Sequence, residues 1–169
     1  FIYEYVSRKA GFTTNVGNLL RFPEAGKLMG LAAYGEAQVN WEPWIRPRTG
    51  AYSLGISAYD IFLEIAALEK KYDDGAGKPY LRPWLVSLAR KAQDELERAL
   101  VHVVQVAIEQ TGVRHLCMAG GVALNSVANY QILREANLED IYIFPAAGDN
   151  GIAAGAALWA YHQDGGSER

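Results

Sequence analysis

The sequence has 169 residues, of which 50% are hydrophobic and 21% are charged, and its formal net charge is −3. This length fits a single domain, and the apolar content excludes a disordered chain. The slightly acidic balance provides no broad basic field for a nucleic-acid backbone or an anionic membrane. One cysteine excludes an internal disulfide and fits a reducing compartment, and no apolar run reaches the roughly 18 residues of a membrane span. We therefore expect a cytoplasmic globular protein with no nucleic-acid or membrane partner.

The two ends of the sequence differ from those of a typical complete domain. The chain starts at Phe1 without an initiator methionine, so we expect it to be part of a longer polypeptide. Its last residues are small, polar or charged. We expect one folded unit over 1–162 and a flexible tail over 163–169.

The first half of the chain contains two short helical patterns and an irregular stretch. Apolar residues at helical spacing predict one helix over 1–10 and another over about 24–33, with Gly35 in a left-handed conformation after the second. Aromatic and proline residues then predict an irregular insert over about 38–84, with a possible strand at 51–56.

The second half alternates between helix and strand patterns. A long amphipathic pattern predicts a helix over about 85–110, which a glycine ends. Two apolar runs predict strands at 115–119 and 141–144, and each leads into a helix, over about 120–136 and 151–162. This alternation predicts an α/β fold with a parallel sheet covered by helices.

The first strand-to-helix turn, 119–125, contains two adjacent glycines. Because Gly120 and Gly121 have no side chains, phosphate oxygens could reach main-chain N–H groups there, and Asn125 would offer an amide to a ribose or base. A tight structural turn explains the same residues equally well.

The second strand-to-helix turn, 145–151, contains Asp149. This carboxylate could cap the helix that follows or bind a divalent cation beside phosphates. The residues alone favour the capping role, which is the commoner use of such an aspartate.

Several familiar catalytic patterns are missing from the sequence. Lys27 is followed by leucine and lacks the upstream glycine of a phosphate-binding loop, and neither Gly-x-Gly-x-x-Gly nor Gly-x-Ser-x-Gly occurs. His102, His115 and His162 do not have the spacing of zinc ligands. We expect Cys117 to be a small apolar residue in a strand core rather than a nucleophile.

Three segments in this order resemble the O-carbamoyltransferases of the nodulation and cephamycin-biosynthesis type. They are 24–35 (EAGKLMGLAAYG), 120–125 (GGVALN) and 145–151 (PAAGDNG), and the resemblance covers about 1–161. The last two segments also resemble enzymes that make threonylcarbamoyladenosine in tRNA and the carbamoyltransferases of hydrogenase maturation. The resemblance implies an actin-like ATPase lobe of the ribonuclease H-like type, with a mixed or parallel sheet flanked by helices, here the second lobe of a two-lobed domain.

The resemblance also implies a reaction and a set of site residues. ATP and carbamoyl phosphate would give carbamoyl-adenylate, and the carbamoyl group would pass to a hydroxyl of a sugar or other natural product. The phosphates would lie against Gly120 and Gly121, and the adenosine would lie against Asn125. Asp149 would bind iron or manganese, while magnesium would accompany ATP. Three further residues would line the nucleotide pocket: Lys27, Gly30 and Gly35.

The sequence departs from the family pattern in two respects. The family's His-x-x-x-His metal ligands and first lobe have no counterpart here, and its separate carboxy-terminal domain is also missing. We therefore expect the isolated chain to be catalytically incomplete, with the missing lobe and domain of the same protein as its partners. The sequence does not decide whether the chain also forms a homodimer. The alternatives are a threonylcarbamoyl-adenylate enzyme acting on tRNA and a non-catalytic nucleotide-binding or scaffold fragment.

Overall fold

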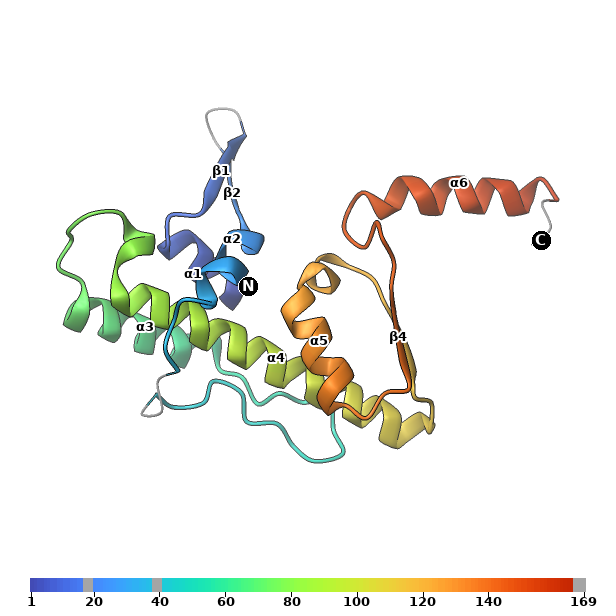
Figure 1. Ribbon diagram of the computed structural model, residues 1–169, viewed down its shortest axis with the longest axis horizontal. Coiled ribbons are helices and arrows are strands. Elements are labelled where there is room, and N and C mark those ends of the chain that lie inside the picture. Colours follow the sequence, from blue (N-terminus) through green and yellow to red (C-terminus); the bar gives the residue numbers. More distant parts are fainter. Residues whose placement is uncertain (17–19, 38–40, 166–169) are drawn as a thin grey trace.

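The computed structural model describes residues 1–16, 20–37 and 41–165. One long helix, α4 (Pro83–Thr111), has 29 residues, so it runs about 44 Å through the molecule (Figure 1). Helices α1 to α3 pack along its first half, while α5 and a parallel strand pair pack along its second half. The predicted helix over 85–110 is confirmed, and Gly112 ends it with a φ of 71°.

The first half of α4 carries the larger of two hydrophobic cores. Helix α1 (Ile2–Lys9) and helix α2 (Ala25–Ala32) confirm the two short helices predicted from apolar spacing. Val6, Leu28 and Leu88 are fully buried, which joins α1, α2 and α4 in one cluster. Between α1 and α2, the antiparallel hairpin of β1 (Thr13–Val16) and β2 (Leu20–Pro23) projects from this core (Figure 1).

The segment between α2 and α4 is more ordered than the sequence predicts. It contains α3 (Ala58–Tyr72), whose Ser57 side chain accepts a hydrogen bond from Asp60 N, and a short 3₁₀ helix at Pro79–Leu81. The sequence predicts an irregular insert around a possible strand over about 38–84, and the part that contains α3 and the 3₁₀ helix is instead regular. The predicted strand at 51–56 is also wrong, because the chain turns back there and Arg46 N donates to Leu54 O at 2.8 Å.

A polar network fastens this segment to α4. Glu95, on α4, accepts a hydrogen bond from Ile45 N at 3.0 Å, and Lys91 donates to the main-chain oxygen of Glu42 at 2.5 Å. The Lys91 ammonium also lies 5.0 Å from the ring centre of Trp44. Because Lys91 and Glu95 are both buried and paired with each other, they fix the position of the 42–46 stretch.

The second half of α4 packs against the parallel strands β3 (His115–Met118) and β4 (Asp140–Ile143) and against α5 (Ser126–Glu135). Val101, Val104 and Ile132 form the centre of this smaller core. The strand alternation turns Leu116 and Met118 towards it and leaves Cys117 exposed. The expectation that Cys117 is a core residue is wrong for that reason.

Helix α6 (Gly151–Gln163) extends away from the rest of the molecule (Figure 1). It confirms the last predicted helix, yet none of its described side chains is buried, and Ile152 and Trp159 are largely exposed. Its apolar residues occupy every side, a pattern that is usual for helices covered by other structure. Residues 166–169 of the predicted tail lie outside the described residues.

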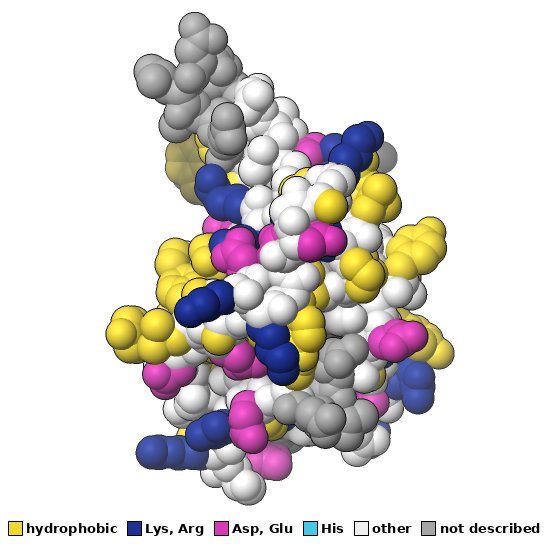
Figure 2. Space-filling model, turned by 90° about the vertical axis from the view of Figure 1, so that its left-hand side faces the viewer, with side chains coloured by type: hydrophobic (Ala, Val, Ile, Leu, Met, Phe, Trp, Pro, Cys, Tyr) yellow, Lys and Arg dark blue, Asp and Glu magenta, His cyan; other side chains and the backbone are white. Residues whose placement is uncertain are grey.

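The fold is mixed α/β and mainly helical, with two small sheets among the described residues. The predicted parallel pairing is confirmed for β3 and β4. No helix in the described part of the chain is long and apolar enough to cross a membrane. On the face drawn in Figure 2, Lys and Arg side chains are interspersed with Asp and Glu, as the near-neutral composition predicts.

Candidate functional site

The two strand-to-helix turns lie next to each other. Gly120 adopts a φ of 97°, and its N–H donates to Ala147 O in the second turn at 2.7 Å. A Cβ atom added at Gly120 or Gly121 would meet nothing within 4 Å, so this surface is open. The chain then forms the 3₁₀ turn η2 (Gly121–Leu124) before α5 begins, so the predicted helix starts later than expected. The two turns therefore form one continuous surface at the ends of β3 and β4.

Asn125 connects this surface to α4. Its side-chain oxygen accepts from Ala128 N at 3.0 Å, which caps α5, and from Gln93 Nε2 at 3.1 Å. Its amide nitrogen donates to Gln93 Oε1 at 2.9 Å. Both carboxamides are buried, so the pair holds the turn against α4.

Tyr3 extends this network to α1. Its hydroxyl donates to Gln93 Oε1 at 2.8 Å, and burial raises the pKa of Tyr3 to about 12. Neither Tyr3 nor Gln93 is predicted as a site residue from the sequence. A glutamine between Ala89, Ala92 and Leu96 on the buried side of α4 is the signal that could have pointed to an internal polar contact.

A cavity of about 620 Å³ lies beside this network. Gly121 and Asn125 form one wall, and Gly26 and Met29 of α2 form another. The rest is largely apolar and comes from α1, α4 and the segment after α2, including Trp44. The structure thus brings parts of the 24–35 and 120–125 segments to one space whose volume suits a small organic ligand.

The other predicted residues of 24–35 lie outside this cavity wall. Lys27 is exposed and donates to Glu24 at 2.7 Å, which lowers the pKa of the Glu24 carboxyl. Gly30 is exposed and has open space around it. Gly35 is not left-handed, so that prediction is wrong; it packs so tightly on α4 that a Cβ would lie 2.4 Å from Val86 O.

Asp149 is exposed at the second turn. Its main-chain oxygen accepts from Ile152 N at 3.2 Å, and the helix cap position belongs to Asn150, without a side-chain cap hydrogen bond. Among the residues that the structure describes, no group of three or more His, Cys, Asp or Glu side chains could hold a metal ion. The described residues therefore do not form a metal centre by themselves, and a single carboxylate does not hold a first-row metal tightly.

Two of the three histidines, His102 and His115, have structural surroundings. His102 contacts Ala51 O at 2.8 Å, which fastens the 48–53 turn to α4. His115 lies at the start of β3 with Glu139 at 3.9 Å. Neither histidine lies on the wall of the cavity that Gly121 and Asn125 line.

Comparison with known proteins identifies the family. The family model for the carbamoyltransferase N-terminus matches residues 1–158. The chain belongs to this carbamoyltransferase family. The match spans all three segments that carried the resemblance, so that prediction is confirmed.

Individual relatives agree with this assignment. An uncharacterized protein of Synechocystis is 33% identical over 96% of the chain, and another of Methanocaldococcus jannaschii is 32% identical over 93%. Nodulation protein NolO of Bradyrhizobium diazoefficiens is 33% identical over 78% of the chain. Nodulation protein NolNO of Sinorhizobium fredii is 45% identical over 42%.

These relatives are much longer than the chain. The matched part is 27% of the Synechocystis protein and 24% of both the Methanocaldococcus protein and NolO. The chain therefore spans about a quarter of the length of these relatives.

Proposed function

We propose that the chain supplies part of the nucleotide site of an ATP-dependent O-carbamoyltransferase and forms the second lobe of an actin-like domain over 1–162. In the first step, ATP, carbamoyl phosphate and water give carbamoyl-adenylate, pyrophosphate and phosphate. In the second step, a hydroxyl of a sugar or other natural product attacks the carbamoyl carbon, the bond to AMP breaks, and the hydroxyl proton is lost. The products are a carbamate ester and AMP.

The observation that carries this proposal is the cavity shared by Gly26, Gly121 and Asn125. Two segments about 95 positions apart, both within the match to the family, meet at its wall. The flat face of an adenine base suits the largely apolar lining of this cavity. The open surface at this turn lets phosphate oxygens approach the main chain of Gly121, since the Gly120 N–H already donates to Ala147 O.

The other predicted site residues lie in different surroundings. Asn125 lies on the cavity wall, where its buried side chain would shape the adenosine pocket. Lys27 and Gly30, on the exposed side of α2, stay predicted nucleotide contacts. Gly35 stays one too, although its packing on α4 gives it a structural reason of its own. Asp149 as one ligand of iron or manganese stays a prediction that needs further donors from outside the described residues.

The test uses the full-length protein with ATP, carbamoyl phosphate and a panel of hydroxyl acceptors. We expect AMP release that depends on the acceptor, together with a product heavier by one carbamoyl group. Gly26→Leu should raise the KM for ATP at least tenfold, because the new side chain enters the cavity and no atom lies within 4 Å of its Cβ position to disturb folding. Ala66→Leu, at an exposed position of α3, is the matched control. An unchanged KM in Gly26→Leu would contradict the assignment of the cavity.

The same assay separates the alternatives. AMP release that requires threonine and tRNA would identify a threonylcarbamoyl-adenylate enzyme. ATP binding without turnover in the full-length protein would favour a non-catalytic nucleotide-binding or scaffold role. The isolated 169-residue chain is expected to be inactive.

A further inference from the structure

Gln93 lies behind the wall of the 620 Å³ cavity and not on it. Its side chain is buried, and only 3% of the residue is exposed. Two of its hydrogen-bond partners, Tyr3 and Asn125, do line the cavity. Any effect of Gln93 on a bound ligand must therefore pass through these two wall residues.

The carboxamide of Gln93 has no hydrogen-bonding capacity left. Its oxygen accepts from the Tyr3 hydroxyl at 2.8 Å and from Asn125 Nδ2 at 2.9 Å. Its nitrogen donates to Asn125 Oδ1 at 3.1 Å and to Glu97 Oε1 at 2.8 Å. A carboxamide offers two lone pairs and two protons, so every position is used. Gln93 is thereby fixed in one orientation between α1 and the 119–125 turn.

The carboxamide of Asn125 is satisfied in the same way. Its oxygen accepts from Ala128 N and from Gln93, and its nitrogen donates to Gln93. A further hydrogen bond links Asn125 to Tyr3, and it offsets part of the rise in the pKa of Tyr3 that burial causes. No position of the Asn125 side chain is left for a ligand. This residue can therefore influence a ligand only through its place on the wall.

The charges on the cavity wall indicate which part of ATP suits the space between Tyr3 and Asn125. Among the described residues that line the cavity, none is Lys, Arg or His, whereas Glu4 and Glu95 contribute carboxyl groups. Burial of phosphate charges without a cation is costly. The base and the ribose therefore suit the cavity, and the phosphates suit the open surface at Gly121.

We propose that Gln93 is a positioning residue for the nucleoside part of ATP. It holds Tyr3 and Asn125 at a fixed separation, so the cavity is formed before the nucleotide binds. Without Gln93, ATP would have to order both wall side chains itself, which lowers its affinity. The inference rests on the proposed function, because it takes this cavity as the nucleotide site.

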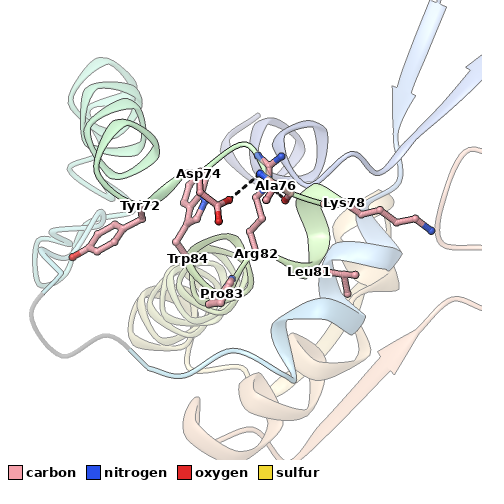
Figure 3. A pocket seen from close by; sticks show the side chains of 9 residues that line it. Tyr72, Asp74, Ala76, Lys78, Leu81, Arg82, Pro83 and Trp84 are labelled. Carbon is pink, nitrogen blue, oxygen red and sulfur yellow. Dashed lines mark hydrogen bonds between the residues drawn. The ribbon is translucent and has the colours of Figure 1, made fainter.

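A smaller cavity, of about 330 Å³, lies at the start of α4 and supplies a control position. Figure 3 shows its wall, which includes Leu81 and Trp84. This wall shares no residue with the one that carries Tyr3 and Asn125. Because Leu81 is 68% exposed, Leu81→Ala changes the smaller cavity without removing buried structure.

The test compares Gln93→Met with wild type in the full-length protein. Methionine keeps the length and the helical preference of the side chain but forms none of its hydrogen bonds. We expect the KM for ATP and the inhibition constant of adenosine to rise about tenfold, as for a site that its ligand must order. Inhibition by inorganic tripolyphosphate and the KM for carbamoyl phosphate should stay unchanged. A merely structural role would lower kcat without distinguishing adenosine from tripolyphosphate.

Two control variants and one milder variant accompany this comparison. Gln105→Met makes the same substitution at an exposed position of α4, where Gln105 donates to Glu135 O at 3.0 Å. Gln105→Met and Leu81→Ala should leave all four constants unchanged. Should Gln93→Met fold poorly, Tyr3→Phe removes only the hydroxyl from the network and should raise the two adenosine-dependent constants about threefold.

Three outcomes would overturn the proposal. The first is an unchanged inhibition constant of adenosine in Gln93→Met, or in Tyr3→Phe where only that variant folds. The second is a constant for tripolyphosphate that rises as much as the one for adenosine, and the third is a wild-type enzyme that adenosine does not inhibit.

Gly26→Leu separates this failure from a failure of the proposed function. If Gly26→Leu raises the KM for ATP while Gln93→Met does not, only the positioning role is lost. If neither variant changes this KM, the cavity is not the nucleotide site and both proposals are lost.

Discussion

Asn125→Ala is expected to loosen the beginning of α5 far more than the loss of an ordinary helix cap. The substitution removes the cap to Ala128 N and leaves the buried Gln93 carboxamide without its partner. The cap contributes about 1 kcal/mol, and unpaired buried polar groups cost about 1–3 kcal/mol. The sum, about 2–4 kcal/mol, corresponds to a loss of local protection of roughly 30- to 700-fold.

Hydrogen exchange of the full-length protein, read by mass spectrometry on peptides over 121–135, measures this change. Ser57→Ala is the matched control, because Ser57 caps the exposed start of α3 through Asp60 N at 3.3 Å and has no amide pair behind it. It should reduce protection of the first turn of α3 only about fivefold, as expected for a cap alone. Equal losses in the two variants would refute the idea that Gln93 and Asn125 stabilise each other.

Three further substitutions test other parts of the structure. Because burial raises the pKa of Tyr3 to about 12, the free energy of unfolding should fall between about pH 10 and 12, where the unfolded chain loses this proton more readily than the folded one. In an alkaline unfolding titration, Tyr3→Phe should remove this fall in stability. An identical fall in the variant would contradict the prediction. Glu95→Gln leaves the buried Lys91 without its charge partner and should lower the free energy of unfolding by about 3–5 kcal/mol, measured as faster proteolysis within 42–56. Glu42→Gln, at an exposed ion pair, is the control and should change it by less than about 1 kcal/mol. Gly35→Ala should lower the melting temperature, because its Cβ would lie 2.4 Å from a main-chain oxygen of α4. Gly30→Ala, in open space on α2, should keep or raise the melting temperature. An unchanged melting temperature in Gly35→Ala would show that α4 can move aside.

The elements that sequence alone predicts well are those with a long, regular pattern. Helix α4 follows from apolar residues repeated over many turns and from Gly112 in the left-handed conformation at its end. The parallel pair β3 and β4 follows from two apolar runs, each leading into a helix. In these cases local preference and tertiary packing point to the same structure.

Shorter elements are decided by contacts that the local pattern does not contain. The β1–β2 hairpin has four-residue strands without clear alternation, and helix α3 lies among aromatic and proline residues that predict irregular chain. Gly35 looks like a helix-ending glycine, yet its reason is the close approach of α4, which comes about 50 positions later.

The sequence predicts the separate motifs of the candidate site but not the cavity that they line. The glycine turn and the 24–35 segment are visible in the sequence, whereas the cavity between them exists only once α2 and the turn both pack on α4. The amide pair of Gln93 and Asn125 joins positions 32 apart, so it too appears only after the chain is folded.

Helix α4 has a consequence for how this family can change in length. A single residue inserted between Trp84 and Gln93 would turn the part of α4 after the insertion by about 100° relative to the part before it and shift it by about 1.5 Å along the axis. Every side chain beyond the insertion would then face a new direction, and the amide pair with Asn125 could not form. Relatives that keep the amide pair and both hydrophobic cores should therefore vary in the loops before α4 and conserve the number of residues within this stretch.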